Sequence, residues 1–326
     1  MPAASGYYYQ NGLLKPFAEG GTPLAPTGTG GGGTAPPPGG AGMLVGESRN
    51  NANTALYTSM ATQAGPYTVS RAYQSGQWRA TWAADSGGSD VGQRATVYSC
   101  KPNMTSMASG ALDASLTAFV ASIPDSHVAF LCMWHEPDVK LRKGAINLAQ
   151  WQAAQLRFCQ VVKAVGKPHV YTTVILSNWS AIGGVSVGTP DEFWVGPDGP
   201  DRLIDVVGWD MYLFTNTPTT GAHEQQACVQ FCQSHGAAYG IGEIGLLTAV
   251  TDMTVGAAWM HTQADYAAAS GAAGPHGSAA YLCWFDQNVG TATSGQVPVP
   301  SASPTLITAA KAISGEYLTP YTTFVL

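Results

Sequence analysis

Residues 127–138 read HVAFLCMWHEPD, and residues 238–245 read AYGIGEIG. Each segment is a short apolar run bounded by turn residues, which is typical of a strand buried on both faces. Each run ends in a glutamate, Glu136 in the first and Glu243 in the second. Packing does not call for these carboxylates, because burying an unpaired charge is costly. We therefore expect two strands of one parallel sheet that direct both acids into a shared cleft, which is the minimal equipment for cleaving a glycosidic bond.

From residue 43 onward, strand-like runs alternate with helical stretches. The predicted strands are 43–46, 67–71, 95–100, 127–134, 169–176, 203–209, 238–242 and 279–284, and the predicted helices are 110–121, 145–165, 221–235, 255–270 and 305–316. Eight strands, most of them followed by a helix, predict an α/β fold of the (β/α)8 TIM barrel type over 43–326. A doubly wound open sheet is the main alternative, but no Gly-x-Gly-x-x-Gly follows the first strand, as a dinucleotide site would require.

Residues 1–42 differ from the rest in composition. Residues 28–40 read GTGGGGTAPPPGG, which predicts a flexible linker because so little apolar surface can be buried. Ahead of it, residues 7–17 read YYYQNGLLKPF, an aromatic and apolar segment. Two readings of this N-terminal arm remain open, a segment that docks onto another chain, such as a virion or tail protein, and a disordered tail.

Composition excludes several functional classes. The 326 residues carry a net charge of −6, which argues against nucleic acid as a partner. No apolar stretch approaches the roughly 20 residues of a membrane span. The N-terminus lacks the basic region and apolar core of a signal peptide, yet the low content of charged residues, 10%, resembles that of proteins that work outside a cell. A virion-associated protein, such as a phage tail component, or an exported chain without its signal would fit both observations.

Polar and aromatic residues gather at the predicted strand ends, where a barrel builds its site. Those proposed to bind substrate are Arg71, Trp134, His135, Asn178, Trp209, Asp210, Tyr212, Trp284 and Asp286. The apolar neighbours of Glu136 favour a raised pKa, which a general acid needs. Small residues precede Glu243 and leave room for a ligand. In alternative readings Glu136 caps the next helix, and Glu243 pairs with Arg71 or Lys101.

The segments 134–136 (WHE), 207–212 (VGWDMY) and 242–245 (GEIG) resemble the large clan of retaining (β/α)8 glycoside hydrolases. Within that clan the histidine before the first glutamate is most similar to glycoside hydrolase family 26, the mannanase-like group. The proline after Glu136 follows the Asn-Glu-Pro pattern of other members, so the chain mixes two signatures. The resemblance implies that Glu136 is the acid/base and Glu243 the nucleophile. It also implies that Tyr212 hydrogen-bonds the nucleophile, His135 contacts the sugar and Trp284 is a stacking platform.

The resulting hypothesis is a retaining, endo-acting glycosidase that degrades a polysaccharide without a cofactor. No metal site is expected, because no His-x-x-x-His or His-Glu-x-x-His occurs. The six cysteines include no Cys-x-x-Cys pair and are expected to be buried thiols. The alternative function is a non-catalytic carbohydrate-binding or structural virion protein on the same barrel.

Overall fold

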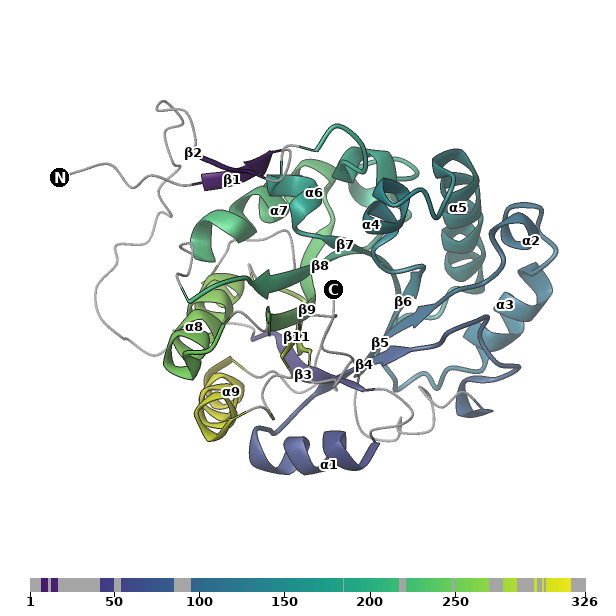
Figure 1. The fold of residues 1–326 in the computed structure, drawn as a ribbon. Helices are drawn as coiled ribbons and strands as arrows, with labels where there is room; N and C mark the ends of the chain where they lie inside the picture. Colours follow the sequence, from purple (N-terminus) through teal and green to yellow (C-terminus); the bar gives the residue numbers. More distant parts are fainter. Residues whose placement is uncertain are drawn as a thin grey trace.

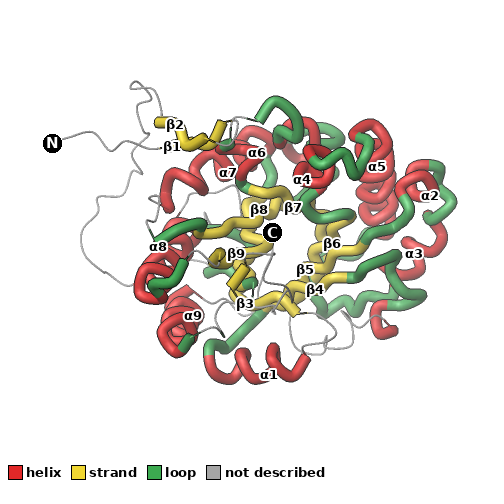
Figure 2. The backbone as a smooth tube through the Cα atoms, in the orientation of Figure 1, coloured by secondary structure: helices red, strands yellow, loops and turns green. Residues whose placement is uncertain are grey.

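The computed structural model describes residues 7–10, 13–16, 42–49, 54–84, 95–183, 185–216, 221–247, 250–269, 278–285, 296–297, 301 and 303–317. Eight parallel strands form a closed ring, because the last strand pairs with both the first and the seventh (Figure 2). In chain order they are β3 (Leu44–Arg49), β4 (Val69–Tyr73), β5 (Ala95–Cys100), β6 (Ala129–Met133), β7 (Val170–Ser177), β8 (Val206–Leu213), β9 (Ala238–Leu247) and β10 (Tyr281–Trp284). The predicted TIM barrel is confirmed.

Helices surround the ring on its outside (Figure 1). They are α1 (Thr54–Gln63), α2 (Met104–Ala108), α3 (Asp113–Ala121), α4 (Pro137–Arg142), α5 (Leu148–Val165), α6 (Trp179–Ile182), α7 (Gly221–His235), α8 (Met253–Ala269) and α9 (Pro304–Tyr317). Short 3-10 turns lie at Trp82–Ala84, Pro190–Phe193 and Gly199–Asp201. Strand β5 and helix α7 have the predicted bounds. Helices α1, α2, α4 and α6 are additional to the prediction, and three of these four are only four to six residues long.

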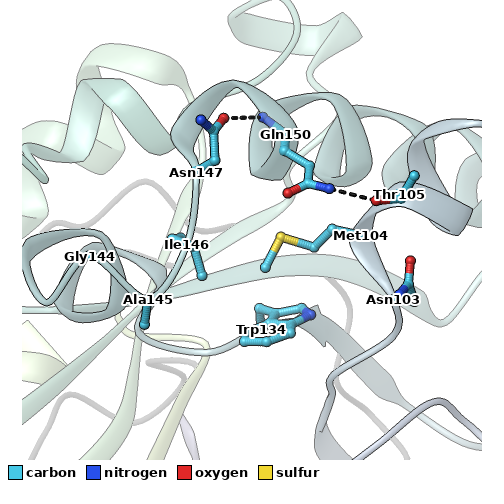
Figure 3. Close-up of a pocket in the computed structure, with 9 residues that line it drawn as sticks. All are labelled: Asn103, Met104, Thr105, Trp134, Gly144, Ala145, Ile146, Asn147 and Gln150. Carbon is cyan, nitrogen blue, oxygen red and sulfur yellow. Dashed lines mark hydrogen bonds between the residues drawn. The ribbon is translucent and has the colours of Figure 1, made fainter.

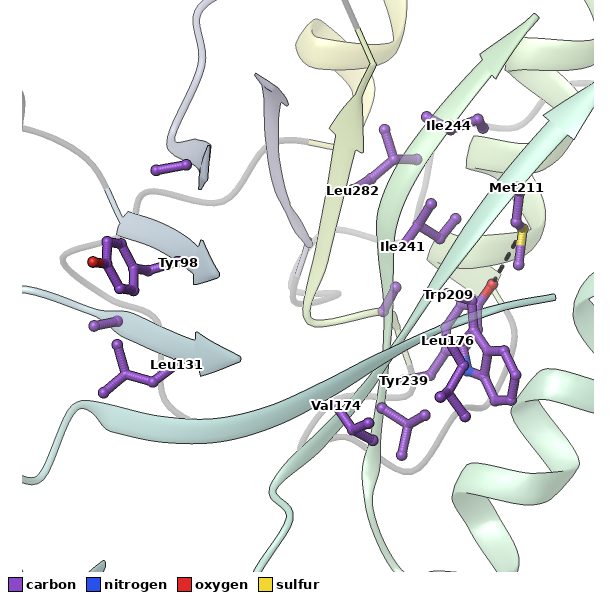
Figure 4. Close-up of a cluster of buried hydrophobic side chains, with 14 of the residues drawn as sticks. Tyr98, Leu131, Val174, Leu176, Trp209, Met211, Tyr239, Ile241, Ile244 and Leu282 are labelled. Carbon is purple, nitrogen blue, oxygen red and sulfur yellow. Dashed lines mark hydrogen bonds between the residues drawn. The ribbon is translucent and has the colours of Figure 1, made fainter. Parts of the chain in front are cut away.

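Alternation along the strands divides the core into two layers. Residues that point into the barrel include Leu44, Val69, Val97, Phe130, Ile175 and Tyr281. Their neighbours along the strands point outward and pack under the helices; Figure 4 shows ten of these labelled, among them Leu176, Trp209 and Ile241. Successive residues of a strand face opposite sides of a sheet. A residue's place in this alternation therefore decides whether it can reach the barrel's interior.

Strand β9 carries one extra residue, a β-bulge, at Gly242. On one side Ile241 pairs with Trp209 while Glu243 pairs with the very next residue, Asp210. On the other side, Leu282 and Trp284 are two residues apart but pair with Ile241 and Ile244, which are three apart. A bulge re-aims the side chains that follow it. As a result Gly242 and Glu243 both face the interior, although strict alternation would turn Glu243 toward the helices.

Helix α5 is closed at both ends by its own sequence. The Asn147 side chain accepts a hydrogen bond from the Gln150 amide at 3.0 Å, which satisfies one of the free N–H groups at the start. Gly166 ends the helix with φ of 71°, a left-handed conformation that glycine adopts without steric cost. The Asn147 cap fixes where the loop before α5 ends and the helix begins.

Parts of the N-terminal arm and of the last loop lie outside the described residues. Within the arm, β1 (Tyr7–Gln10) and β2 (Leu13–Pro16) pair antiparallel. The linker segment 28–40, and Asp286 in the loop after β10, lie outside the described residues. A two-residue strand, β11 (Gln296–Val297), pairs antiparallel with β9. All six cysteines are buried and none forms a disulfide within the described part of the chain. Among the described helices, none is long and apolar enough to cross a membrane.

Candidate active site

The Glu243 carboxylate is held by two tyrosines from different strands. The Tyr73 hydroxyl at the end of β4 donates to Oε1 at 2.6 Å, and the Tyr212 hydroxyl of β8 donates to Oε2 at 2.6 Å. Burial, and next the charge of Glu243, raise the pKa of both phenols, so both remain donors. Hydrogen bonds to both oxygens fix the plane of the carboxyl group. The two tyrosines thereby orient the Glu243 side chain.

Tyr73 is a site residue that sequence reasoning missed. It follows Arg71 by two positions on β4, so both side chains face the barrel interior. Side chains two positions apart on a strand face the same side, so a prediction that Arg71 faces the interior could also have identified Tyr73. The guanidinium of Arg71 lies 4.3 Å from the centre of the Tyr73 ring, which holds the ring in place from below.

Removing the Tyr73 hydroxyl tests the role of its hydrogen bond to the Glu243 carboxylate. Tyr73→Phe is expected to lower kcat for the reaction proposed below by about 10-fold to 100-fold, with a smaller change in KM. The reason is that one oxygen of Glu243 loses its donor while the ring still fills its space. Steady-state kinetics measure the split, and Tyr266→Phe on the barrel exterior is the matched control. An unchanged kcat would show that Tyr212 alone orients the carboxylate.

Glu136 sits in a strained turn directly after β6. Trp134 and Glu136 both have positive φ, 55° and 51°, an uncommon conformation for residues other than glycine. The turn is held because the Glu136 N–H donates to the Ile175 carbonyl of β7 at 2.8 Å. Burial, followed by the charges of Glu243 and Asp138, raises the pKa of Glu136 to about 7. Such a carboxyl exchanges a proton near neutral pH.

Helix capping does not account for Glu136. It occupies the N-cap position of α4, but its side chain makes no capping hydrogen bond. The next acid, Asp138, has the structural role instead. Its buried carboxylate accepts from the Ser177 N–H at 3.3 Å and from the Ser180 hydroxyl, and it pairs with Arg142 at 3.1 Å. The structure thus ties α4 to β7 through Asp138 and leaves the Glu136 carboxyl available.

Arg71 and Asp210 lie in the barrel interior beneath the two glutamates. Arg71 is fully buried and donates to the carbonyls of Ala72 and Val97. No salt bridge joins Glu243 to Arg71 or Lys101, three residues that the structure describes, so the ion-pair reading of Glu243 is wrong. The buried Asp210 carboxyl makes no hydrogen bond within the described part of the chain.

Burial and the neighbouring acids disfavour the charged form of Asp210. Burial first, then the charges of Glu243 and Glu136, raise its pKa well above the usual range. A cluster of three carboxyls cannot all ionise in a desolvated space. The arrangement leaves Glu243 as the carboxyl that the tyrosines hold and Glu136 as the one whose pKa is raised to about 7.

Two further predicted residues lie at this face of the barrel. The His135 ring meets the Tyr73 ring edge-on, with 5.4 Å between centroids. Burial, then the positive charges of Arg71 and Lys101, lower the pKa of His135 well below its usual value, so the imidazole is neutral. Asn178 follows β7 and is buried, with its N–H donating to the Asp210 carbonyl at 3.1 Å. Both can offer neutral hydrogen-bonding groups.

The structure corrects two aromatic predictions. Trp209 and Trp284 point outward and are fully buried under the helices. Figure 4 shows the Trp209 ring, which packs against Phe231 of α7. Neither can touch a ligand in the barrel mouth, because each occupies an outward position in the strand alternation. Phe285, one residue after Trp284, lies on the interior side instead, with its ring centroid 5.9 Å from that of Tyr212. Trp134 remains at the mouth, half-buried.

One group of possible metal ligands lies away from this site. His261 and Asp265 of α8 and Glu316 of α9 place ligand atoms within 4.8 Å of one another on the helical exterior. Two of the three side chains are exposed, and Asp265 accepts a hydrogen bond from Tyr317 at 2.7 Å. The barrel-mouth residues described above are carboxyls, phenols and amides without a matching ligand group. The chemistry available there is proton transfer and nucleophilic attack by carboxylates.

Comparison with known proteins shows which solved structures share this fold. No protein-family model matches the chain, and no curated protein matches it in sequence. Solved structures do match. An endo-beta-1,4-mannanase double mutant of Cellulomonas fimi is 13% identical, with a TM-score of 0.55, and the match covers 87% of this chain and 73% of that one.

Two other solved structures show a similar likeness. The protein XacCel5A is 10% identical, with a TM-score of 0.53 over 84% of this chain and 99% of its own. A beta-glucosidase designated 1317 is 10% identical, with a TM-score of 0.52 over 83% and 90%. At these identities the likeness establishes the (β/α)8 barrel, and the chemistry has to be argued from the residues themselves.

Proposed function

We propose that this protein is a retaining glycoside hydrolase that cleaves a polysaccharide by double displacement. The observation that carries the proposal is the unequal environment of the two glutamates. The Glu243 carboxylate accepts two phenolic hydrogen bonds that fix its orientation, whereas burial and the charge of Glu243 raise the pKa of Glu136 to about 7. One nucleophile and one proton donor, set apart by their surroundings, are what this reaction needs.

The proposed reaction has two steps. In the first, the Glu243 carboxylate attacks the anomeric carbon, the bond from that carbon to the leaving oxygen breaks, and Glu136 gives its proton to that oxygen. In the second, Glu136 takes a proton from water, the water oxygen attacks the anomeric carbon and the bond to Glu243 breaks. Two inversions give net retention of configuration. The half-buried His135 and the buried Asn178, both beside this centre, would hydrogen-bond the sugar hydroxyls.

The substrate class follows from the lining and from the fold's relatives. Neutral polar groups lie beside the carboxyls, as suits a neutral sugar; they are the Tyr73 and Tyr212 hydroxyls, the His135 imidazole and Asn178. Among the similar structures, two have names that refer to a mannanase and a beta-glucosidase, which supports a polysaccharide of hexose units as the first substrate to try. Within the proposal the enzyme is endo-acting, and its composition, rich in small residues and low in charge, suits work outside the cell or on a virion.

Product analysis tests the proposal. The purified protein is incubated with mannans, xylans, glucans and bacterial cell-wall polysaccharides, and released products are identified by mass spectrometry. For a cleaved substrate, proton NMR at early times follows the new anomeric centre. The expected result is release of oligosaccharides whose anomer matches the substrate. Initial formation of the opposite anomer would exclude Glu243 as a covalent nucleophile, and tight binding without cleavage would favour the non-catalytic barrel.

A further inference from the structure

A pocket opens beside the active-site turn, on the same face of the barrel. It has a volume of about 540 Å³ and is lined by Asn103, Met104, Thr105, Trp134, Gly144, Ala145, Ile146, Asn147 and Gln150 (Figure 3). These residues come from the β5–α2 turn and the start of α2, from the β6–α4 turn, and from the α4–α5 loop and the start of α5. This volume falls within the range of about 300–1,000 Å³ that small-ligand pockets occupy.

The pocket is continuous in sequence with the catalytic turn. Trp134 lines it, and Glu136 follows two residues later in the same strained turn. Residues that follow β5 and β6 lie at the carboxyl ends of those strands, where Glu136 and Glu243 also lie. The pocket therefore lies on the same face of the barrel as the two glutamates, on the side of β5 and β6.

The pocket has a fixed apolar floor. The Trp134 indole Nε1 donates to the Pro102 carbonyl at 2.8 Å, which locks the ring's orientation. Figure 3 shows the Met104 and Ile146 side chains gathered above the Trp134 ring. A ring held in one orientation, with the apolar Met104 and Ile146 side chains beside it, offers an apolar surface to a sugar and costs little ordering entropy on binding.

The rim of the pocket is polar and uncharged. Gln150 donates to the Thr105 hydroxyl at 2.6 Å, while the side-chain oxygens of Asn103 and Asn147 accept from backbone amides. Those bonds leave the Nδ2 groups of Asn103 and Asn147 and the Oε1 of Gln150 without a hydrogen bond among the described residues. None of the nine lining residues carries a charge. The pocket thus offers donors and an acceptor to hydroxyl groups and nothing to balance a charged ligand.

We propose that this pocket is a distal subsite that binds one neutral sugar unit of the polysaccharide while the scissile bond lies at Glu136 and Glu243. The inference rests on the proposed function and adds to it the requirement for a substrate long enough, or branched enough, to span both places. A neutral hexose stacks on Trp134 and hydrogen-bonds Asn147 and Gln150. A polymer with a carboxylate or sulfate on that unit is disfavoured.

Affinity as a function of chain length tests the subsite. In a Glu243→Gln background, which separates binding from turnover, calorimetry compares disaccharides with hexasaccharides of β-1,4-mannan, β-1,4-glucan and β-1,3-glucan. Ala145→Trp places an indole in the exposed wall of the pocket, and Gln150→Ala removes the free acceptor. The matched control is Ala164→Trp, an exposed alanine near the far end of α5. Circular dichroism checks that each variant is folded.

The expected result is that Ala145→Trp lowers the ratio of hexasaccharide to disaccharide affinity at least 10-fold, Gln150→Ala lowers it about 3-fold, and Ala164→Trp leaves it at the background value. An unchanged ratio in both pocket variants, with polysaccharide cleavage by the parent, overturns the subsite and leaves the hydrolase standing. A lowered ratio with no cleavage by the parent overturns the hydrolase and keeps the sugar pocket. Failure of every hexasaccharide to bind overturns the subsite outright.

Discussion

Glu243→Gln is expected to lower polysaccharide cleavage by about 10⁴-fold or more while leaving the fold intact. The glutamine amide fits between the Tyr73 and Tyr212 hydroxyls, which lie 2.6 Å from the two oxygens, but it is neutral and a poor nucleophile. Asp210 is not expected to replace Glu243 as the attacking carboxylate, because Asp210 is buried and its pKa is raised well above the usual range. Release of reducing sugar, with melting temperature measured alongside, gives the comparison.

The matched control for this variant is Glu316→Gln, an exposed glutamate on α9. It makes the same chemical change far from the barrel mouth and is expected to retain full activity. Should Glu243→Gln keep more than a tenth of the parent's rate, attack by Glu243 would be excluded and the tyrosine-held anion would have to serve another purpose. Adding a small external nucleophile such as azide to a Glu243→Ala variant is expected to restore cleavage, with inverted product.

Glu136→Gln is expected to lower kcat/KM on a polysaccharide by about 10²- to 10⁴-fold. The loss should be far smaller on an aryl glycoside whose phenolate leaves without a proton, because the first step then needs no acid. Since the pKa of Glu136 is raised to about 7, the parent's rate is expected to fall as pH rises above 7. The variant should lack that fall. A pH profile of unchanged shape would assign the proton donor to another group.

The same replacement is expected to affect stability in a pH-dependent way. The folded protein holds Glu136 at a pKa of about 7, above the ordinary value of 4.5, so the contribution of the protonated form is present below 4.5 and is lost as pH rises through 7. A neutral glutamine avoids that loss. The variant should therefore melt at a higher temperature than the parent at pH 8 and at nearly the same temperature at pH 4, which calorimetry can measure.

The barrel was predictable from the sequence because its strands are buried on both faces. Runs such as 95–100 consist of residues that are all buried, so they appear in the sequence as short, largely apolar runs bounded by turn residues. The short helices α2, α4 and α6 leave no such trace, since a helix of four to six residues is stabilised by its surroundings rather than by its own periodicity. Helix α1 has only a weakly amphipathic sequence pattern, so the sequence alone did not predict it.

Side-chain direction was the harder part of the site to predict. Glu136, Glu243 and Tyr212 stood out by residue type, and the structure gathers them at one end of the barrel. Trp209 and Trp284 were placed at the mouth because they end strands, but each occupies an outward position, and Phe285 faces inward instead. Tyr73 was overlooked because a tyrosine in a strand is also a common core residue. A polar or aromatic residue at the end of a strand can be predicted to lie near the barrel mouth. Whether its side chain points inward or outward depends on its position in the alternation along the strand.

That alternation has an evolutionary consequence at β9. Gly242 is the additional residue that turns Glu243 inward, where Tyr73 and Tyr212 meet it. A chain lacking Gly242 would keep the same eight strands but would direct Glu243 under the helices, away from the Tyr73 and Tyr212 hydroxyls. The deletion of one codon would therefore remove the proposed nucleophile from the barrel interior without changing the barrel.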